Sequence, residues 1–342
     1  MHLLVIRTSA MGDVALTVPV IGSLKLQYPE TKVTLLIRPA FRPFFNSIPS
    51  LQIYDAGFDG IHKGLRGLLR LYRDFIKPGN FDYIIDLHDV LRTKILRWLF
   101  RFSGGLTFII DKGRAEKRIL IKGRSKSQLK HTVRRYLDVF SRAGFDIDPM
   151  NWKCIIPSCG AYGKIAGMIG NSGFMNIGIA PYAKHRLKIW PEEYMLQLTE
   201  MISQKIKAEF WLFGGKEEYE SLSGLHHRIP GSYLAAGDLS LDEQLALMTR
   251  LDLMITMDSA NMHLASLTGV KVISIWGGTD PLAGFGAWNQ PPELSLRIPV
   301  EELSCRPCTV YGKGRCRRGD FACMKWLTPE KIFNRLTELE IL

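Results

Sequence analysis

The chain has 342 residues, of which 46% are hydrophobic and 23% are charged. This length is typical of two domains, and the composition provides enough apolar residues for two cores. No apolar stretch reaches the ~18 residues expected of a membrane span, and the first residues read as a strand rather than a secretory signal. We therefore expect a cytoplasmic protein.

Positive charge is concentrated in one part of the chain. The formal net charge is +12, and residues 62–135 contain nineteen Lys and Arg against six Asp and Glu. The other residues hold 26 basic and 27 acidic side chains, which nearly cancel. So uneven a distribution favours an anionic partner: nucleic acid, an anionic membrane surface or an acidic substrate.

The first half alternates predicted strands and helices. The pattern predicts strands over residues 3–7, 32–37 and 81–87, and helices over residues 14–27, 64–76, 91–102 and 131–143. Strands and helices that alternate at this spacing indicate βαβ units on a parallel sheet.

The pattern restarts after Pro157-Ser158-Cys159-Gly160, a turn-forming sequence that marks the domain boundary. Strands are then predicted over residues 176–180, 209–213, 253–256 and 270–275, with helices over residues 191–205, 241–249 and 261–268. Thr328 and Pro329 form a helix-start signal. We expect this last helix to pack back on the first domain.

One polar segment follows the first predicted strand. In Ser9-Ala10-Met11-Gly12-Asp13, Gly12 allows a close turn and Asp13 stands near a helix start. Asp13 is therefore either a plain helix cap or a catalytic carboxylate.

The second half has two comparable segments. Asp258-Ser259-Ala260-Asn261-Met262-His263 follows a predicted strand, where the backbone N–H groups of a helix start can bind phosphate, although Asp258 and Ser259 also suit caps. The loop Lys184–Glu192 carries three cations and a histidine, which suit either a diphosphate or a solvated loop. Because ligands bind at the carboxyl ends of parallel strands, we expect two facing α/β domains with a reaction between them.

Together these segments, with Lys188-Ile189-Trp190-Pro191 and Gly277-Gly278-Thr279-Asp280-Pro281, resemble the ADP-heptose:lipopolysaccharide heptosyltransferases of glycosyltransferase family 9. The resemblance implies a GT-B fold, with two facing Rossmann-like domains and a cleft between them. Residues 1–158 would form a basic acceptor-binding domain, residues 159–326 a nucleotide-sugar-binding domain, and residues 327–342 a helix returning to the first.

The resemblance also implies the reaction. It would be an inverting, metal-independent transfer of a heptose from ADP-heptose, without a cofactor, to the inner core of lipopolysaccharide on a Kdo–lipid A type acceptor. The enzyme would be cytoplasmic and peripheral to the inner membrane. Asp13 would act as general base, and Lys188 would hold the donor phosphates. Donor-binding roles are implied for Ser9, Gly12, Tyr182, Ala183, Glu217, Asp258, Ser259, Ala260, Asn261 and His263.

Two departures from the family pattern leave questions open. Ala260-Asn261 stands where Gly-Pro is commoner, and Lys216-Glu217-Glu218 leaves open which carboxylate binds the ribose, and hence which nucleotide is used. Two alternative functions stay open, the first because of these departures and the second because of the basic first half. One is transfer from another nucleotide sugar to an anionic glycan. The other is a protein that binds nucleic acid or an anionic surface without catalysis.

Two further features have alternative interpretations. In residues 91–102, Leu91, Ile95, Trp98, Leu99 and Phe102 share one side and Lys94, Arg97 and Arg101 another, which favours a sheet-packing helix over an interfacial one. The cysteines Cys305, Cys308, Cys316 and Cys323 are spaced C-x2-C-x7-C-x6-C. Free thiols are the expected state, and a structural zinc site is the alternative.

Overall fold

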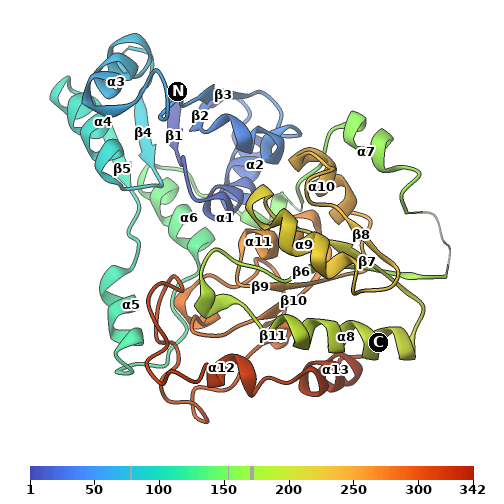
Figure 1. Ribbon diagram of the computed structural model, residues 1–342. Coiled ribbons are helices and arrows are strands. Elements are labelled where there is room, and N and C mark those ends of the chain that lie inside the picture. Colours follow the sequence, from blue (N-terminus) through green and yellow to red (C-terminus); the bar gives the residue numbers. More distant parts are fainter. Residues whose placement is uncertain (78, 153, 170–172) are drawn as a thin grey trace. The chain divides into compact units, whose positions relative to one another are not determined.

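The computed structural model describes residues 1–77, 79–152, 154–169 and 173–342. Its contacts divide the chain into two compact units (Figure 1). The first consists of Met1–Lys112 and Thr132–Ile156, and the second of Gly113–His131 and Pro157–Leu342.

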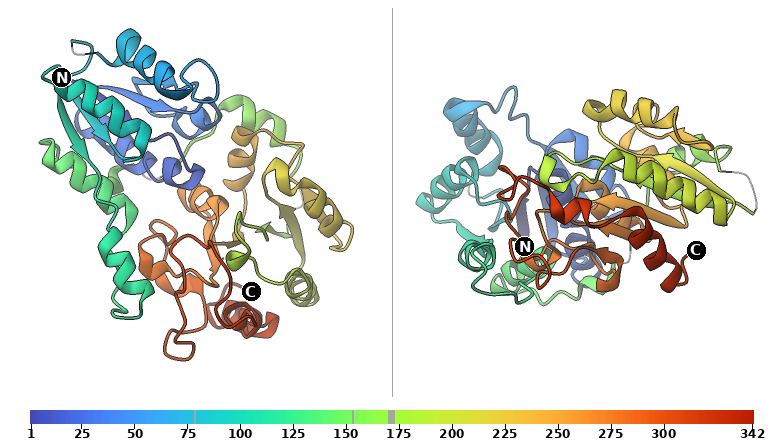
Figure 2. Two further views of the ribbon diagram at one scale, coloured as in Figure 1. Left: turned by 60° about the vertical axis from the view of Figure 1, so that its left-hand side comes forward. Right: turned by 60° about the horizontal axis from the view of Figure 1, so that its bottom comes forward.

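The first unit is a parallel sheet of five strands in the order β3-β2-β1-β4-β5. The strands are β1 (His2–Ile6), β2 (Lys32–Ile37), β3 (Leu51–Asp55), β4 (Tyr83–Asp86) and β5 (Leu106–Ile109). Its helices are α1 (Met11–Ala15), α2 (Val18–Gln27), α3 (Gly64–Leu71), α4 (Leu91–Phe102) and α6 (Thr132–Arg142). The central strand β1 is almost wholly apolar because helices cover both faces of the sheet (Figures 1 and 2).

The second unit is a parallel sheet of six strands in the order β11-β10-β9-β6-β7-β8. The strands are β6 (Met175–Ala180), β7 (Ala208–Leu212), β8 (Ser232–Leu234), β9 (Leu253–Met257), β10 (Lys271–Ile275) and β11 (Ser295–Leu296). Its helices are α5 (Arg114–Ile121), α7 (Cys159–Ile165), α8 (Glu192–Lys205), α9 (Tyr219–His226), α10 (Leu241–Met248), α11 (Ala260–Thr268), α12 (Ala322–Lys325) and α13 (Pro329–Glu338).

Each sheet has one point where the strand order reverses. It lies between β1 and β4 in the first unit and between β6 and β9 in the second. In open α/β sheets, ligands bind outside the carboxyl ends of the strands at such a switch point. The two parallel sheets confirm the predicted fold class. The elements that were not predicted are β3, β5, β8, β11, α5, α7, α9 and α12.

The helix predicted over residues 14–27 is two helices, α1 and α2, with Leu16 and Thr17 between them. Pro19 stands in the first turn of α2. Proline has no N–H to continue the hydrogen-bond ladder of a preceding helix, so a new helix begins there.

The segment Gly113–His131 leaves the first unit and returns to it. Leu129 N donates to Leu282 O over 2.9 Å, Gln128 Nε2 to Pro281 O over 3.0 Å, and a His131 ring nitrogen lies 2.9 Å from Gly286 O. The sequence prediction assigns this basic segment to the first domain, whereas its contacts belong to the second unit.

The last helix, α13, packs within the second unit. Its start is as expected, because the Thr328 side chain caps α13 by accepting from Lys331 N. However, Ile332 and Leu336 are buried in the core of the second unit with Leu198 and Ile202 of α8. The helix that was predicted to pack back on the first domain thus packs on α8 within the second unit.

Helix α4 buries a different face from the one that its apolar stripe predicts. Leu91, Trp98 and Phe102 are exposed, whereas Thr93, Leu96, Arg97 and Phe100 are buried. Leu96 and Phe100 join the core, and Arg97 is buried because two carboxylates neutralise it. The helix thus packs on the sheet, as predicted, but through Leu96 and Phe100 rather than through Leu91, Trp98 and Phe102. None of the helices in the described ranges is long and apolar enough to cross a bilayer.

Candidate functional site

The first half-site lies at the switch point of the first unit. Arg7 directly follows β1, and its buried guanidinium pairs with the Asp13 carboxylate of α1. Arg7 Nη1 also donates to Leu87 O over 2.5 Å, and Tyr136 OH donates to the Asp13 backbone carbonyl over 3.0 Å. Asp13 is thus held by Arg7 and Tyr136, while its side chain keeps 30% exposure toward solvent.

His88, which follows β4, connects the two loops of this half-site. Its Nδ1 lies 3.0 Å from Thr8 Oγ1, and its Nε2 lies 3.2 Å from Ser9 Oγ. Burial and the nearby positive charge of Arg7 lower the pKa of His88 to about 3. The ring is therefore neutral near pH 7, with one nitrogen able to donate and the other to accept.

A buried carboxylate, that of Asp86, holds the His88 loop by hydrogen bonds to its backbone. Asp86, at the end of β4, accepts from the backbone nitrogens of His88 and Asp89 over 2.8 and 2.9 Å. Arg97 of α4 lies 2.9 Å from Asp86 and 3.2 Å from Asp89. Because a buried charge needs a partner, the position of the loop depends on this group of charges.

The second half-site lies at the switch point of the second unit. Lys188 Nζ lies 2.8 Å from Asp258 Oδ2, and both side chains are largely buried. Asp258 follows β9 directly and precedes α11. Ser259 is the N-cap residue of α11, but its side chain makes no capping hydrogen bond. A plain capping role therefore does not account for Ser259, and the first turn of α11 offers backbone N–H groups to an anion.

Glycines let the Lys188 loop pack closely against the turn after β10. Gly278 N donates to Leu187 O over 2.8 Å, and Cys308 N donates to Gly278 O over 3.0 Å. A Cβ on Gly277 would lie 2.7 Å from Leu187 O, and one on Gly312 would lie 2.8 Å from Lys188 Cε. Since real Cβ atoms are not found so close to backbone oxygens, a side chain at Gly277 would displace the loop that carries Lys188.

Arg306 fixes the same turn and was not predicted. Its buried guanidinium donates to the carbonyls of Trp276, Gly277, Thr279 and Ile298. It also lies 3.4 Å from Asp280 Oδ2, and Asp280 is fully buried. These acceptors are backbone atoms, so no side-chain motif in the sequence indicates this role.

Tyr182, Ala183 and Glu217 come from neighbouring loops of the second sheet. Tyr182 OH donates to Glu192 Oε2 over 2.6 Å, and burial together with this bond raises the pKa of Tyr182. Glu218 accepts from Gly215 N over 2.9 Å, whereas Glu217 is exposed. Glu218 is thus committed to the turn, which favours Glu217 as the carboxylate available to a ligand.

The predicted residues fall into two groups. Ser9, Gly12 and Asp13 lie in the first unit, beside His88. The others lie in the second: Tyr182 and Ala183 after β6, Lys188 next to Asp258, Glu217 after β7, and Ser259, Ala260, Asn261 and His263 at the start of α11. His263 is buried. Arg7, His88 and Arg306 were not predicted.

The late cysteines are free thiols. Burial raises the pKa of Cys323 to about 11 and also raises that of Cys308. Within the part of the chain that the structure describes, no three His, Cys, Asp or Glu side chains are grouped so as to hold a metal ion. The zinc alternative at Cys305, Cys308, Cys316 and Cys323 stays a prediction, since the other three thiols also help to raise the pKa of Cys323.

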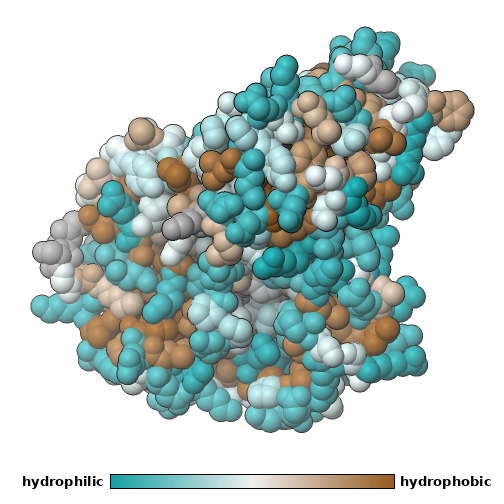
Figure 3. Space-filling view, turned by 180° about the vertical axis from the view of Figure 1, so that it is seen from behind, coloured by the Kyte–Doolittle hydropathy of each residue, from teal (hydrophilic) through white to brown (hydrophobic). Residues whose placement is uncertain are grey.

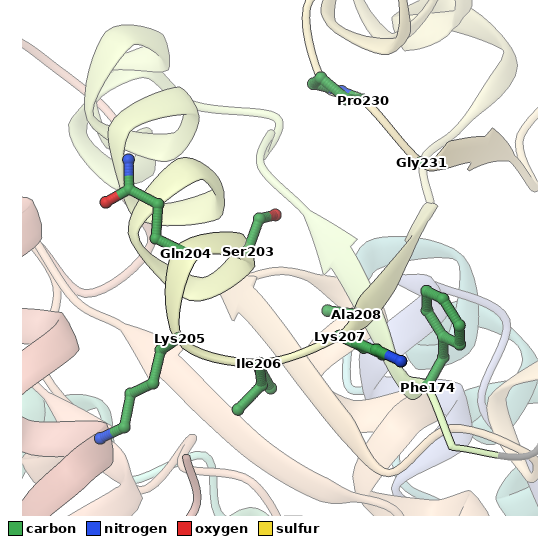
Figure 4. Close-up of a pocket in the computed structure, with 9 residues that line it drawn as sticks. All are labelled: Phe174, Ser203, Gln204, Lys205, Ile206, Lys207, Ala208, Pro230 and Gly231. Atoms are coloured by element: carbon green, nitrogen blue, oxygen red, sulfur yellow. The ribbon is translucent and has the colours of Figure 1, made fainter.

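A cavity of about 510 Å³ lies elsewhere, next to the segments that lead into β6, β7 and β8 (Figure 4). Phe174 and Lys207 lie side by side along it, and Lys205 contributes a second cation. It lies at the amino ends of the strands, the edge opposite to the Lys188–Asp258 pair. We do not assign it to the candidate site.

Comparison with known proteins agrees with the fold. A profile of glycosyltransferase family 9 (heptosyltransferase) matches residues 69–313. Lipopolysaccharide core heptosyltransferase OpsX of Haemophilus influenzae is 24% identical over 346 residues, covering 99% of this chain and 93% of that protein.

Two solved structures have the same GT-B architecture. The glycosyl transferase family 9 structure from Veillonella parvula superposes with a TM-score of 0.76 at 19% identity, covering 99% of this chain and 96% of that one. Heptosyltransferase WaaC of E. coli, solved with ADP-2-deoxy-2-fluoro heptose, gives a TM-score of 0.66 at 17% identity and covers 99% and 100% of the two chains.

Proposed function

The chain belongs to glycosyltransferase family 9, the heptosyltransferase family, and from this premise we propose that it transfers a heptose from ADP-heptose to the inner core of lipopolysaccharide. The observation that carries the proposal is the Lys188–Asp258 pair at the start of α11. It places a lysine cation and the N–H groups of a helix start at one switch point, where a diphosphate can bind.

We propose that the second unit holds the donor. Lys188 Nζ would move from Asp258 to a phosphate oxygen, and the N–H groups of α11 would bind the other oxygens. Both stabilise the negative charge that develops on the leaving ADP. The WaaC structure contains an ADP-heptose analogue, which supports the same donor class for this chain.

We propose that the first unit activates the acceptor through Asp13. The acceptor hydroxyl oxygen attacks the anomeric carbon while its proton passes to the Asp13 carboxylate. The bond between the anomeric carbon and the phosphate oxygen breaks, and ADP leaves with the electron pair. Attack on the face opposite to the leaving group inverts the configuration. Arg7 and Tyr136 orient Asp13 without covering its exposed part.

The reaction would need neither a metal ion nor a cofactor, because Lys188 and α11 supply the positive charge for the leaving group. The acceptor would be a Kdo–lipid A type core on the cytoplasmic face of the inner membrane, with the enzyme peripheral to that membrane. OpsX, which matches nearly the full chain, is a lipopolysaccharide core heptosyltransferase, and this supports the acceptor class.

Calorimetric titration with ADP, UDP, GDP and TDP in EDTA tests the donor part of the proposal. Selective ADP binding is the expected result. Preference for another nucleotide would overturn ADP-heptose and favour a different nucleotide sugar, an alternative suggested by Lys216 at the start of the loop after Gly215. If no nucleotide binds and the chain instead binds duplex DNA in a salt-sensitive way, the proposed function is wrong.

A further inference from the structure

Helix α4 presents large apolar side chains to solvent. The exposed fractions are 76% for Leu91, 62% for Trp98 and 82% for Phe102. With 3.6 residues per turn, these positions fall in one stripe, opposite the buried Leu96 and Phe100. Single exposed apolar residues are common, but a stripe of bulky ones marks an interaction site.

The neighbouring helix extends this surface. Helix α3 packs against α4, and the Tyr72 and Ser103 hydroxyls that follow the two helices lie 2.6 Å apart. Leu65 and Leu69, one turn apart on α3, are exposed. In the view from behind, hydrophobic and hydrophilic side chains are interspersed over the first unit, at the upper right (Figure 3). We call the exposed side chains of α3 and α4 the α3–α4 surface.

The charge of the α3–α4 surface has one sign. Neither helix contains an acidic residue. Lys94 and Arg101 of α4 are exposed, and each lies about one helical turn from Trp98, beside the apolar stripe. Arg66 of α3 is exposed as well. Apolar side chains flanked by Lys and Arg are characteristic of helices that lie in the interface of an anionic membrane.

We propose that the α3–α4 surface docks the protein onto an anionic lipid bilayer, with Trp98 and Phe102 entering the interface and Lys94 and Arg101 contacting the headgroups. The Trp98 and Phe102 rings, 5.3 Å apart, form one apolar wedge. Nucleic acid would match the cations but not this wedge, and an apolar protein partner would match the wedge but not the cations. The inference names the surface used at the membrane and takes from the proposed function only that the acceptor is a lipid.

The test is flotation of the full-length protein with phosphatidylcholine vesicles, with and without phosphatidylglycerol. We expect binding to the vesicles with phosphatidylglycerol, weakened by salt. The double substitution Trp98→Ser/Phe102→Ser should abolish it. Since each cation contributes about fivefold near such a surface, Lys94→Gln/Arg101→Gln should weaken it about thirtyfold. Trp98→Phe should retain binding, because the apolar side chain remains.

Trp326→Ser is the matched control, since Trp326 is an exposed tryptophan of the second unit. It should bind as the wild type does.

The proposal is overturned if wild type does not float with anionic vesicles, or if Trp98→Ser/Phe102→Ser floats equally well. It is also overturned if that double substitution converts a dimer into a monomer without changing flotation. Circular dichroism of each variant checks its fold, and because the vesicles contain no acceptor or donor, failure of the proposed transfer would leave this result unaffected.

Discussion

The two switch points carry charge in opposite ways. In the first unit, a carboxylate on a five-residue helix is held by a buried arginine, and side chains connect the loops through the neutral His88. In the second, a lysine is held by a buried aspartate, and backbone carbonyls connect the turn to Arg306. In the proposed reaction, the first switch point supplies the proton acceptor and the second supplies the anion site. In each ion pair the proposed role goes to the partner with the more exposed side chain, which is Asp13 in the first unit and Lys188 in the second.

Asp13→Asn should have the largest effect on the reaction. Removing a general base typically lowers the rate by about 10²- to 10⁴-fold. We expect that loss in kcat from steady-state transfer assays, with unchanged ADP affinity by calorimetry. Asp55→Asn, which alters an exposed carboxylate paired with Arg42, is the control and should leave kcat unchanged. If Asp13→Asn turns over like the wild type, the two switch points do not divide the roles as proposed.

Arg306→Met should have the largest effect on stability. Of the ion pairs that the described residues form with the fully buried Asp280, it leaves the one with Arg297, 3.5 Å away, and it removes the donor of four carbonyls. Breaking a buried ion pair typically costs about 3–5 kcal/mol, and urea unfolding should show a loss in this range. Arg318→Met, at an exposed pair with Asp320, should change the free energy of unfolding little. An unchanged unfolding midpoint for Arg306→Met would show that the turn does not depend on this residue.

Lys188→Ala should weaken ADP binding. A hydrogen bond to a charged group contributes about 1.5–3 kcal/mol, so we expect the Kd from calorimetry to rise about 10- to 150-fold. Lys188→Ala/Asp258→Asn separates the loss of the cation from the charge left on Asp258, and it should bind ADP no better than wild type. Lys331→Ala, an exposed lysine of α13, should bind as wild type does. Equal affinity for all of these proteins would exclude Lys188 from the donor site.

His88→Asn should have the smallest effect, seen in the pH dependence of stability. Because the pKa of His88 is lowered to about 3, the unfolded chain binds a proton that the folded chain does not as the pH falls below 6.5. His88 therefore lowers the free energy of unfolding by about 2 kcal/mol between pH 7.5 and pH 5. Urea unfolding at both values should show a smaller pH dependence for His88→Asn than for wild type. Identical pH dependence would mean that His88 titrates normally.

The sequence predicted what depends on local patterns. Apolar runs located the central strands of both sheets but not the edge strands β3, β5, β8 and β11. The polar residues after the central strands located Asp13 and Asp258 at strand ends. The pairing of Lys188 with Asp258 brings together residues seventy positions apart. The residues themselves left phosphate binding as one of two interpretations for each segment, and the family resemblance indicated both as donor-binding.

The missed features depend on partners that only the folded chain brings together. Arg306 binds carbonyls from two separate segments, which leave no trace in the sequence. Helix α4 has apolar residues on two sides, and the buried side is decided by Asp86 and Asp89, which neutralise Arg97. Helix α13 has the cap signal that was predicted, but its packing on α8 depends on the space that the second core leaves open.

The excursion of Gly113–His131 has a consequence for synthesis on the ribosome. Gln128 and His131 bond to residues 153 and 155 positions later in the chain. At a translation rate of about 5–20 residues per second, this basic segment leaves the exit tunnel about 8–30 s before its partners. The first unit can fold during that interval, because Thr132–Ile156, which completes it, follows directly. The nascent chain therefore carries an exposed cationic loop until the second unit is nearly finished.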